Sequence, residues 1–197
     1  MSSEPSSGAS PPRWTMPRWL EAGRQRGHAL DERWARSLHS GGGRPILVQV
    51  FVWSSRLGDA PMWLLLALLL PVLDPAHGVR VTLELLALGA VNLVVYAALK
   101  FTIRRARPCQ QCAGIQARIE ALDRFSFPSG HTLHAVAFAA LLSQWYPALA
   151  PLVAVFAAVV ALSRVVLGVH YPSDVVAGAV LGLSSASTLH WLFLSIG

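Results

Sequence analysis

Long apolar stretches separated by short polar segments dominate the chain after residue 59. Five of them predict membrane-spanning segments, and they cover residues 60–73, 79–100, 130–146, 149–167 and 174–196. A backbone inside lipid must satisfy its own hydrogen bonds, so such stretches are predicted to be helices. The pattern therefore predicts an all-α, multi-pass membrane helical bundle with about five spanning helices.

The first 59 residues follow a different pattern. Residues 1–27 are polar and lack the apolar centre of a signal peptide, so we expect a disordered or surface-lying leader. Residues 28–59 are mixed and predict an interfacial amphipathic region, and residues 60–197 form the membrane domain. The apolar run from Ile46 to Trp53 is short and favours an N-terminal interfacial helix, with a sixth spanning helix over residues 46–57 as the alternative.

Composition supports a membrane protein. Hydrophobic residues make up 54% of the chain and charged residues only 13%, whereas a soluble domain carries roughly 25% charged residues. The net charge of +6 comes almost entirely from arginine. The arginines form no compact patch, so we expect a membrane surface and an anionic substrate as partners rather than nucleic acid. The two cysteines, Cys109 and Cys112, form a disulfide, half of a metal site, or two ordinary thiols.

Two polar loops, residues 101–129 and 168–173, lie on the same side of the membrane when the predicted crossings are counted. The first motif is Lys100, at the end of the helix before the first loop, then six further residues, and then Arg107–Pro108. A helix turns by about 100° per residue, so a spacing of seven places Lys100 and Arg107 on nearly the same face wherever the helix persists. Pro108 is a natural place for such a helix to stop.

The second motif is Pro128–Ser129–Gly130–His131, which directly precedes an apolar helix. Ser129 is a plausible N-cap, and the free amides at a helix start favour an anion. Gly130 would let a phosphate approach the backbone closely. His131 then lies within one turn of that anion.

The third motif is Ser163–Arg164, five residues, His170, three residues and Asp174. If the turn is compact, the Asp174 carboxylate accepts a hydrogen bond from one imidazole nitrogen of His170. That bond fixes the tautomer and leaves the other nitrogen free to act as a nucleophile. Three fixed cations, an anion-binding helix start and two histidines are the parts that phosphoryl transfer requires.

The three motifs in this order resemble the signature of the type 2 phosphatidic acid phosphatase superfamily. That family includes lipid phosphate phosphatases, polyprenyl diphosphate phosphatases, glucose-6-phosphatase and vanadium haloperoxidases. The resemblance covers residues 100–174 and implies a membrane phosphatase domain that needs neither metal nor other cofactor. It implies that His170 attacks phosphorus to form a phosphohistidine, that Asp174 orients His170, and that His131 protonates the leaving oxygen. The phosphate would be held by Lys100, Arg107, Ser129, Gly130 and Arg164.

The resemblance leaves the substrate open among undecaprenyl diphosphate, phosphatidic acid, phosphatidylglycerophosphate and a prenyl-phosphoryl sugar phosphate. Alternatives are a vanadate-dependent haloperoxidase, which the small size and the spans disfavour, and an inactive membrane scaffold of the same fold. A transporter is disfavoured because the charges gather at one membrane face. Many bacterial members have six spanning helices, and this sequence departs from them because the first of these helices is missing.

Sidedness depends on the number of crossings. The first 59 residues hold eight arginines against five acids, which favours a cytoplasmic N-terminus. Five crossings in a bacterial inner membrane would then place the site on the cytoplasmic face. A sixth crossing or an exported N-terminus would place it in the periplasm, where Cys109 and Cys112 would be oxidised. The sequence does not predict an oligomeric state.

Overall fold

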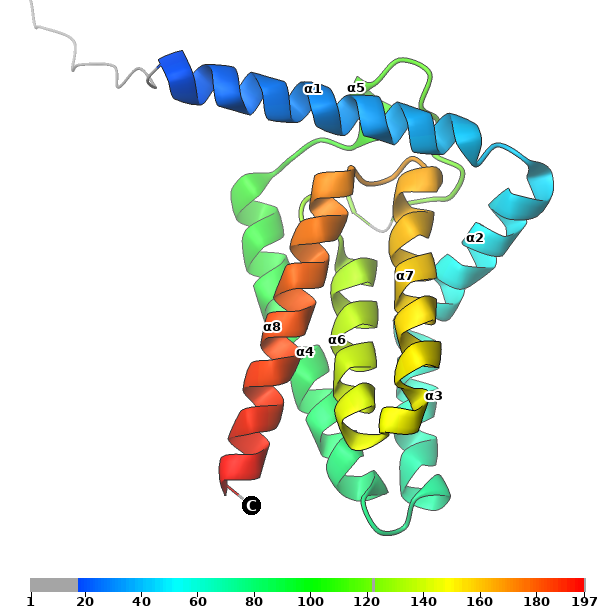
Figure 1. The fold of residues 1–197 in the computed structure, drawn as a ribbon, viewed down its shortest axis with the longest axis vertical. Helices are drawn as coiled ribbons and strands as arrows, with labels where there is room; N and C mark the ends of the chain where they lie inside the picture. The colour runs from blue at the N-terminus through cyan, green and yellow to red at the C-terminus, as the bar shows by residue number, and fades with distance from the viewer. Residues whose placement is uncertain (1–17, 122, 197) are drawn as a thin grey trace, which may run out of the picture.

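The computed structural model describes residues 18–121 and 123–196, and this part of the chain is built from helices (Figure 1). The long helices are α1 Arg18–Gly41, α2 Pro45–Leu57, α3 Ala60–Leu73, α4 Gly78–Ile103, α6 Gly130–Trp145, α7 Ala150–Val166 and α8 Pro172–Ile196. A short helix, α5 Pro108–Gln111, and a 3-10 turn, η1 Pro147–Leu149, complete the set. The predicted all-α class is confirmed.

Helix α6 lies at the centre of the bundle, where it packs against α8, α7 and α4. Its leucines Leu133 and Leu141 are fully buried, and four alanines let neighbouring helices come close. The closest approach is to α8, where a Cβ on Gly178 or Gly182 would lie 2.7 Å from the Ser129 carbonyl oxygen or 2.5 Å from that of Leu133. The Gly178-x3-Gly182 pair therefore serves packing within the chain.

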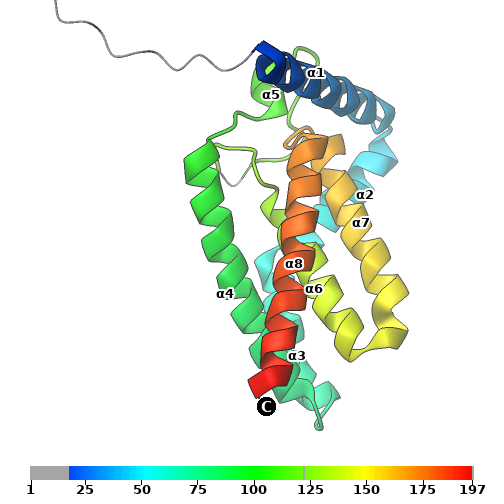
Figure 2. The same ribbon diagram turned by 60° about the vertical axis from the view of Figure 1, so that its left-hand side comes forward.

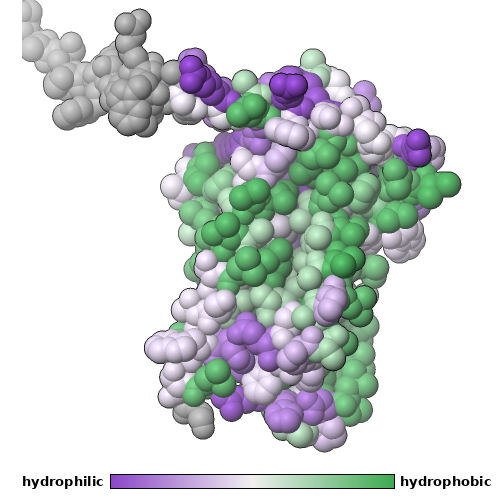
Figure 3. Space-filling view, in the orientation of Figure 1, coloured by the Kyte–Doolittle hydropathy of each residue, from purple (hydrophilic) through white to green (hydrophobic). Residues whose placement is uncertain are grey.

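The outer surface of the bundle exposes many large apolar side chains. Within the described residues, three stretches are long and apolar enough to cross a membrane, namely Gly78–Gln111, Pro147–Val166 and Pro172–Ser195. Pro45–Leu57 with Ala60–Leu73 adds a fourth if this pair, bent by 53°, is one span. On the face seen in Figure 3, hydrophobic residues cover much of the middle of the molecule and polar residues gather toward both ends. The chain is a membrane protein with several apolar helices.

The predicted spans correspond to helices, but their lengths differ. The helix expected over residues 60–73 is α3, which is the second half of the bent pair. Central helix α6 has only 16 residues, fewer than the roughly 20 that a full crossing needs. Its neighbours shield it from lipid, so it is short without exposing backbone.

Helix α1 lies across one end of the bundle, nearly perpendicular to the other helices (Figures 1 and 2). Residues 1–17 of the expected leader lie outside the described residues, and from Arg18 onward the chain is helical. The inward face of α1 holds Asp31, Ala35 and His39, all buried. The His39 ring bonds the Val166 carbonyl oxygen at 2.9 Å, so this face is fixed to the end of α7.

The same end of the bundle collects the C-terminal ends of α4 and α7 and the N-terminal ends of α6 and α8 (Figure 1). Both polar loops therefore lie on one side, as the crossing count predicts. Gly168 permits the tight turn from α7 to α8 because its φ of +78° is costly for other residues. A Cβ there would also lie 2.8 Å from the Gln116 carbonyl oxygen of the first loop.

Candidate active site

Lys100 and Arg107 meet at a carboxylate that the sequence motifs did not reveal. The Lys100 ammonium lies 2.7 Å from Asp123 Oδ2, and Arg107 Nη2 lies 2.9 Å from Asp123 Oδ1. Helix α4 ends at Ile103, and Pro108 begins α5, so the two cations do not share a continuous helix face. They converge because the loop folds back toward Asp123.

Asp123 is bound as an anion between these cations. It also accepts a short hydrogen bond from the Tyr96 hydroxyl and one from the Phe125 amide at 3.0 Å. Burial opposes its ionisation, but the hydrogen bonds from Lys100 and Tyr96 and the charges of Lys100 and Arg107 lower the pKa of Asp123 to about 2. A carboxylate thus occupies a position where these cations would meet a phosphate.

Arg164 is held from the N-terminal part of the chain. Its side chain is buried, and Nη1 donates a short hydrogen bond to the hydroxyl of Ser55 in α2. Within the described residues, Arg164 Nε is buried without a hydrogen-bond partner. A buried guanidinium with a free donor is suited to an anionic ligand, because an unmade bond of this kind is costly.

His170 is buried in the turn before α8, between the cations and Asp174. Its Nε2 atom lies 3.3 Å from Arg107 Nη1, and its Nδ1 atom lies 3.7 Å from Asp174 Oδ2. The expected carboxylate–imidazole pair is thus brought together, at a separation beyond hydrogen-bond length. Burial, followed by the charges of Arg164, Arg107 and Lys100, holds the pKa of His170 well below its usual value, which favours a neutral ring.

The Asp174 carboxylate is fixed by two other groups. Oδ1 accepts a hydrogen bond from Arg105 Nη1 at 2.7 Å, and Oδ2 accepts one from the Tyr171 amide at 2.8 Å. The Arg105 guanidinium also stacks over the Tyr171 ring, with 4.0 Å between its central carbon and the ring centroid. Arg105 thus lies beside the predicted catalytic pair, although it is one of the six unspecified residues between Lys100 and Arg107 in the first motif.

Arg105 connects this pair to α1. Its Nη2 atom lies 2.5 Å from Asp31 Oδ2, and the side chain of Asp31 is almost fully buried. Asp31 also accepts a hydrogen bond from the Ser173 amide at 3.0 Å and a short one from the Ser173 hydroxyl. The helix that crosses the end of the bundle therefore helps to position Asp174 through a chain of charged contacts.

Helix α6 starts at the end of the bundle that also holds Lys100, Arg107 and Arg164. Ser129 is the N-cap residue, as predicted, but its hydroxyl lies 3.0 Å from the Thr132 hydroxyl instead of capping a backbone amide. Its own amide donates to the Asp174 carbonyl oxygen at 3.0 Å. A Cβ on Gly130 would lie 2.7 Å from the Tyr96 ring, so this glycine allows α6 to approach α4. His131 Nε2 lies 2.6 Å from Asp59 Oδ1.

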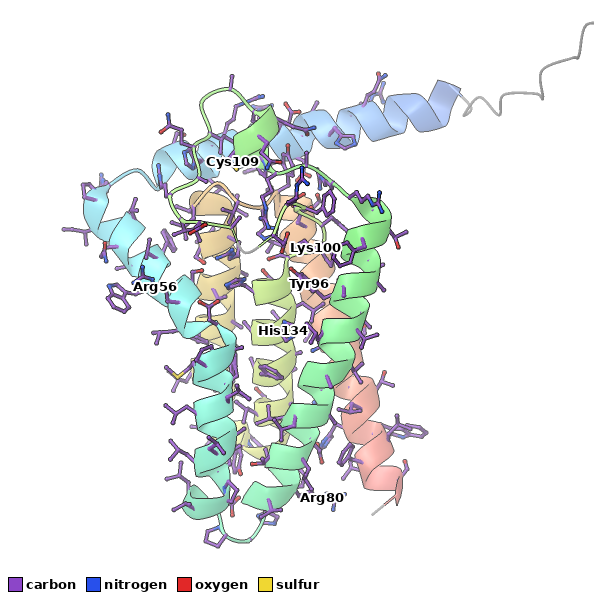
Figure 4. All side chains as sticks on the ribbon, turned by 180° about the vertical axis from the view of Figure 1, so that it is seen from behind. Arg56, Arg80, Tyr96, Lys100, Cys109 and His134 are labelled. Carbon is purple, nitrogen blue, oxygen red and sulfur yellow. The ribbon has the colours of Figure 1, made fainter. Side chains whose placement is uncertain are left out.

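An apolar cavity of about 460 Å³ begins at this cluster and extends along the bundle. Asp59, Tyr96, His131 and His134 lie among mainly apolar lining residues, which are Gly58, Ala60, Trp63, Leu64, Ala67, Leu85, Leu86, Gly89, Ala90, Leu93, Gly130 and Phe138. Figure 4 shows Tyr96 and Lys100 near the end of α4 that carries the site, with His134 deeper in the bundle. The cavity lies between α3, α4 and α6, so it joins a polar site to apolar helix surfaces.

The two cysteines pack beside Tyr171. Both cysteines are free thiols, and Cys112 Sγ lies 3.5 Å from the Tyr171 hydroxyl, so the disulfide interpretation is wrong for this structure. Within residues 18–121 and 123–196, no cluster of three or more His, Cys, Asp or Glu side chains is arranged to hold a metal. Glu84 is buried near the opposite end, where it bonds His190 at 2.9 Å and Trp145 at 3.0 Å.

The profile of the PAP2 superfamily matches residues 81–196, which is more than half of the chain. The chain belongs to the PAP2 superfamily. Its match spans the signature residues from Lys100 to Asp174, so the resemblance drawn from the motifs is confirmed. Asp31, Ser55 and Asp59 lie outside the matched range.

Relatives of this PAP2 chain agree with that assignment. It is 38% identical over 123 residues to decaprenylphosphoryl-5-phosphoribose phosphatase of Mycobacterium tuberculosis. That match covers 61% of this chain and 65% of the relative, which is just under two thirds of its length.

Two solved structures share the fold. One is a transmembrane PAP2-type phosphatidylglycerolphosphate phosphatase from Bacillus subtilis, with a TM-score of 0.71, 25% identity, and coverage of 87% of this chain and 88% of that one. The other is LpxE from Aquifex aeolicus, with a TM-score of 0.68, 23% identity, and coverage of 81% and 93%. The α-helical arrangement is therefore that of PAP2 membrane proteins.

Proposed function

We propose that this PAP2 protein is a metal-independent membrane phosphatase that hydrolyses the phosphate or diphosphate end of a lipid. The observation that supports the proposal is that a cluster of cations lies next to an apolar cavity. Lys100, Arg107 and Arg164 surround the buried ring of His170 at one end of the bundle. A mostly apolar cavity of about 460 Å³ is lined by His131 and Tyr96, and the Tyr96 hydroxyl accepts a hydrogen bond from Lys100 at 2.9 Å. A lipid phosphate has the same division into an anionic end and an apolar tail.

In the first step, His170 Nε2 attacks phosphorus while the bond from phosphorus to the lipid oxygen breaks. His131 gives its proton to that oxygen, so the lipid leaves as an alcohol or, from a diphosphate, as a monophosphate. The three cations stabilise the charge on the equatorial phosphoryl oxygens. For the phosphate to enter between Lys100 and Arg107, it replaces the carboxylate of Asp123.

In the second step, water attacks the phosphohistidine. Neutral His131 takes a proton from that water, the bond from phosphorus to His170 breaks, and inorganic phosphate forms. His131 thereby regains the proton that it lost in the first step. No metal ion enters either step in this proposal.

The cavity and the relatives direct the choice of substrate. Its apolar lining suits a prenyl or acyl chain, and the 38% identical relative is named for a prenyl-phosphoryl sugar phosphate. We therefore place this class first, with undecaprenyl diphosphate, phosphatidic acid and phosphatidylglycerophosphate as the other candidates.

The membrane arrangement that we propose has five crossings. The bent pair α2–α3 forms one crossing, and α4, α6, α7 and α8 form the other four. Helix α1 then lies on the membrane surface at the active-site end. Six described arginines of α1, the α1–α2 turn and the first loop are exposed, namely Arg26, Arg33, Arg36, Arg44, Arg104 and Arg124. Arg80 lies at the opposite end of the bundle (Figure 4). This bias favours a cytoplasmic active site.

The test of the activity is phosphate release by the purified protein in detergent. The substrates are a prenyl-phosphoryl sugar phosphate, undecaprenyl diphosphate, phosphatidic acid and phosphatidylglycerophosphate, each with EDTA present. We expect release from at least one lipid that survives EDTA and disappears in His170→Ala. Release that EDTA abolishes, or that persists in His170→Ala, would overturn the proposed mechanism.

Sidedness is tested with a single exposed thiol on α1. Ser37→Cys is introduced into a chain in which both native cysteines are replaced by serine, because Ser37 is exposed at the active-site end. We expect a membrane-impermeant thiol reagent to label it in inverted vesicles and not in whole cells. Labelling from outside whole cells would place the site on the other face.

A further inference from the structure

The turn between α2 and α3 brings a carboxylate onto the proposed general acid. Asp59 is the residue before α3, and its Oδ1 lies 2.6 Å from His131 Nε2. The His131 side chain is 13% exposed and that of Asp59 is 39% exposed, so the pair joins the buried site to its opening. Both residues line the apolar cavity.

His131 lies among several positive and titratable groups, so a proton on its ring needs a negative partner. The groups that face it are Arg164 from α7, His170 from the turn before α8, Lys100 from α4 and His134 from its own helix. Positive charges at these positions disfavour an imidazolium. An acid that gives a proton to a lipid oxygen must nevertheless carry that proton when substrate arrives. A carboxylate at hydrogen-bond distance favours the protonated ring.

The placement of Asp59 is determined by packing. Gly58 lies against α7, where a Cβ would approach Val160 to 3.0 Å, and its carbonyl oxygen accepts a hydrogen bond from Trp63 Nε1 at 3.1 Å. Ser55, one turn earlier, is bonded to Arg164. The turn is thus anchored to the bundle core on both sides of Asp59.

We propose that Asp59 is a positioning residue that keeps the proton and the orientation of His131 for the first step of phosphoryl transfer. The proposal rests on the proposed function, in which His131 passes that proton to the leaving oxygen as the phosphorus–oxygen bond breaks. In the second step, His131 takes a proton from the attacking water and the pair with Asp59 forms again. No part of the superfamily match assigns this residue, because the match begins at residue 81.

The direct test follows the protonation of His131 by NMR of protein labelled in its histidine rings, in detergent. Asp59→Asn removes the charge and keeps a residue that suits the helix N-cap. We expect the titration of His131, assigned with His131→Gln, to move to lower pH by about one unit or more in Asp59→Asn. Asp59→Glu should restore it, and Glu32→Gln, an exposed acid on α1, should leave it unchanged. An unchanged titration in Asp59→Asn would overturn the proposal.

The kinetic test separates a positioning role from a structural one. For a lipid alkyl phosphate, kcat/KM falls at high pH as His131 loses its proton, and this limb should move to lower pH in Asp59→Asn. The loss should be much smaller for p-nitrophenyl phosphate, because its leaving group departs without protonation. Equal losses for both substrates with an unshifted profile would contradict the proposed role. If the wild-type protein released no phosphate while the NMR shift was present, the proposed function alone would fail.

Discussion

Replacing Arg105 by alanine removes the guanidinium that joins the predicted catalytic carboxylate to α1. Arg105 contacts Asp174 Oδ1 at 2.7 Å through Nη1 and Asp31 Oδ2 at 2.5 Å through Nη2. The Asp174 side chain has no exposed surface, so water cannot easily replace the lost partner. The carboxylate would then be free to turn away from His170 or to take up a proton.

The size of the effect follows from the lost hydrogen bond. A hydrogen bond to a charged group contributes about 1.5–3 kcal/mol. If this energy is lost from the arrangement in which Asp174 faces His170, kcat falls by about 10- to 160-fold, since about 1.4 kcal/mol corresponds to a factor of ten. Asp31→Asn keeps Arg105 and its bond to Asp174 and removes the negative charge that Arg105 and Ser173 share, so we expect a loss of about fivefold.

The assay is phosphate release from a short-chain lipid phosphate, with each variant matched for elution volume and melting temperature in detergent. Arg104→Ala is the matched control, because Arg104 is adjacent and exposed, and its Nε donates only to the nearby Phe101 carbonyl oxygen. It should stay within about twofold of wild type, as surface changes usually do. Arg105→Lys should recover only part of the activity, because an ammonium cannot reproduce the two-sided contact. A folded Arg105→Ala protein with wild-type kcat would refute the reasoning.

Three further predictions concern other parts of the site. The pKa of His170 is lowered in the folded protein, so the unfolded chain binds a proton below about pH 6.5 that the folded chain does not. The free energy of unfolding should therefore fall as the pH drops below about 6.5, by up to about 1.4 kcal/mol per pH unit. His170→Asn lacks this group, so its melting temperature should fall less than that of the wild type between pH 7.5 and pH 5. Asp123→Asn removes the anion that lies between Lys100 and Arg107, so phosphate and vanadate should inhibit more tightly, and weaker inhibition in a folded variant would contradict the competition. Gly89→Leu places a side chain in the apolar cavity, so KM should rise for a long-chain lipid phosphate and change little for a water-soluble one; equal changes for both would exclude the cavity as the site of the tail.

The site residues that the sequence predicts all lie in short motifs. Lys100, Arg107, His131 and Arg164 lie in motifs whose spacing and helix boundaries already suggest an anion site. The apolar stretches likewise predicted the helices, because a lipid-facing backbone has few alternatives. The structure brings these residues to one end of the bundle, as the position of the two loops implied.

The residues that were missed depend on tertiary packing. Asp123 lies in a polar loop where a carboxylate looks like any solvated side chain, and only the fold of the loop reveals its two cationic partners. Asp31, Ser55 and Asp59 come from helices far away in sequence, and no spacing rule connects them to the motifs. The 53° bend between α2 and α3 was also not predicted, although it places Asp59 beside His131.

The central claim is that phosphorus passes through the ring of His170. The direct measurement uses lipid phosphate labelled with ³²P at its terminal phosphorus, mixed rapidly with the purified protein and quenched in alkali, where phosphohistidine is stable. The account predicts transient label on the wild-type chain that maps to His170, with no label on His170→Ala. Label on another residue, or phosphate release by His170→Ala, would contradict the account.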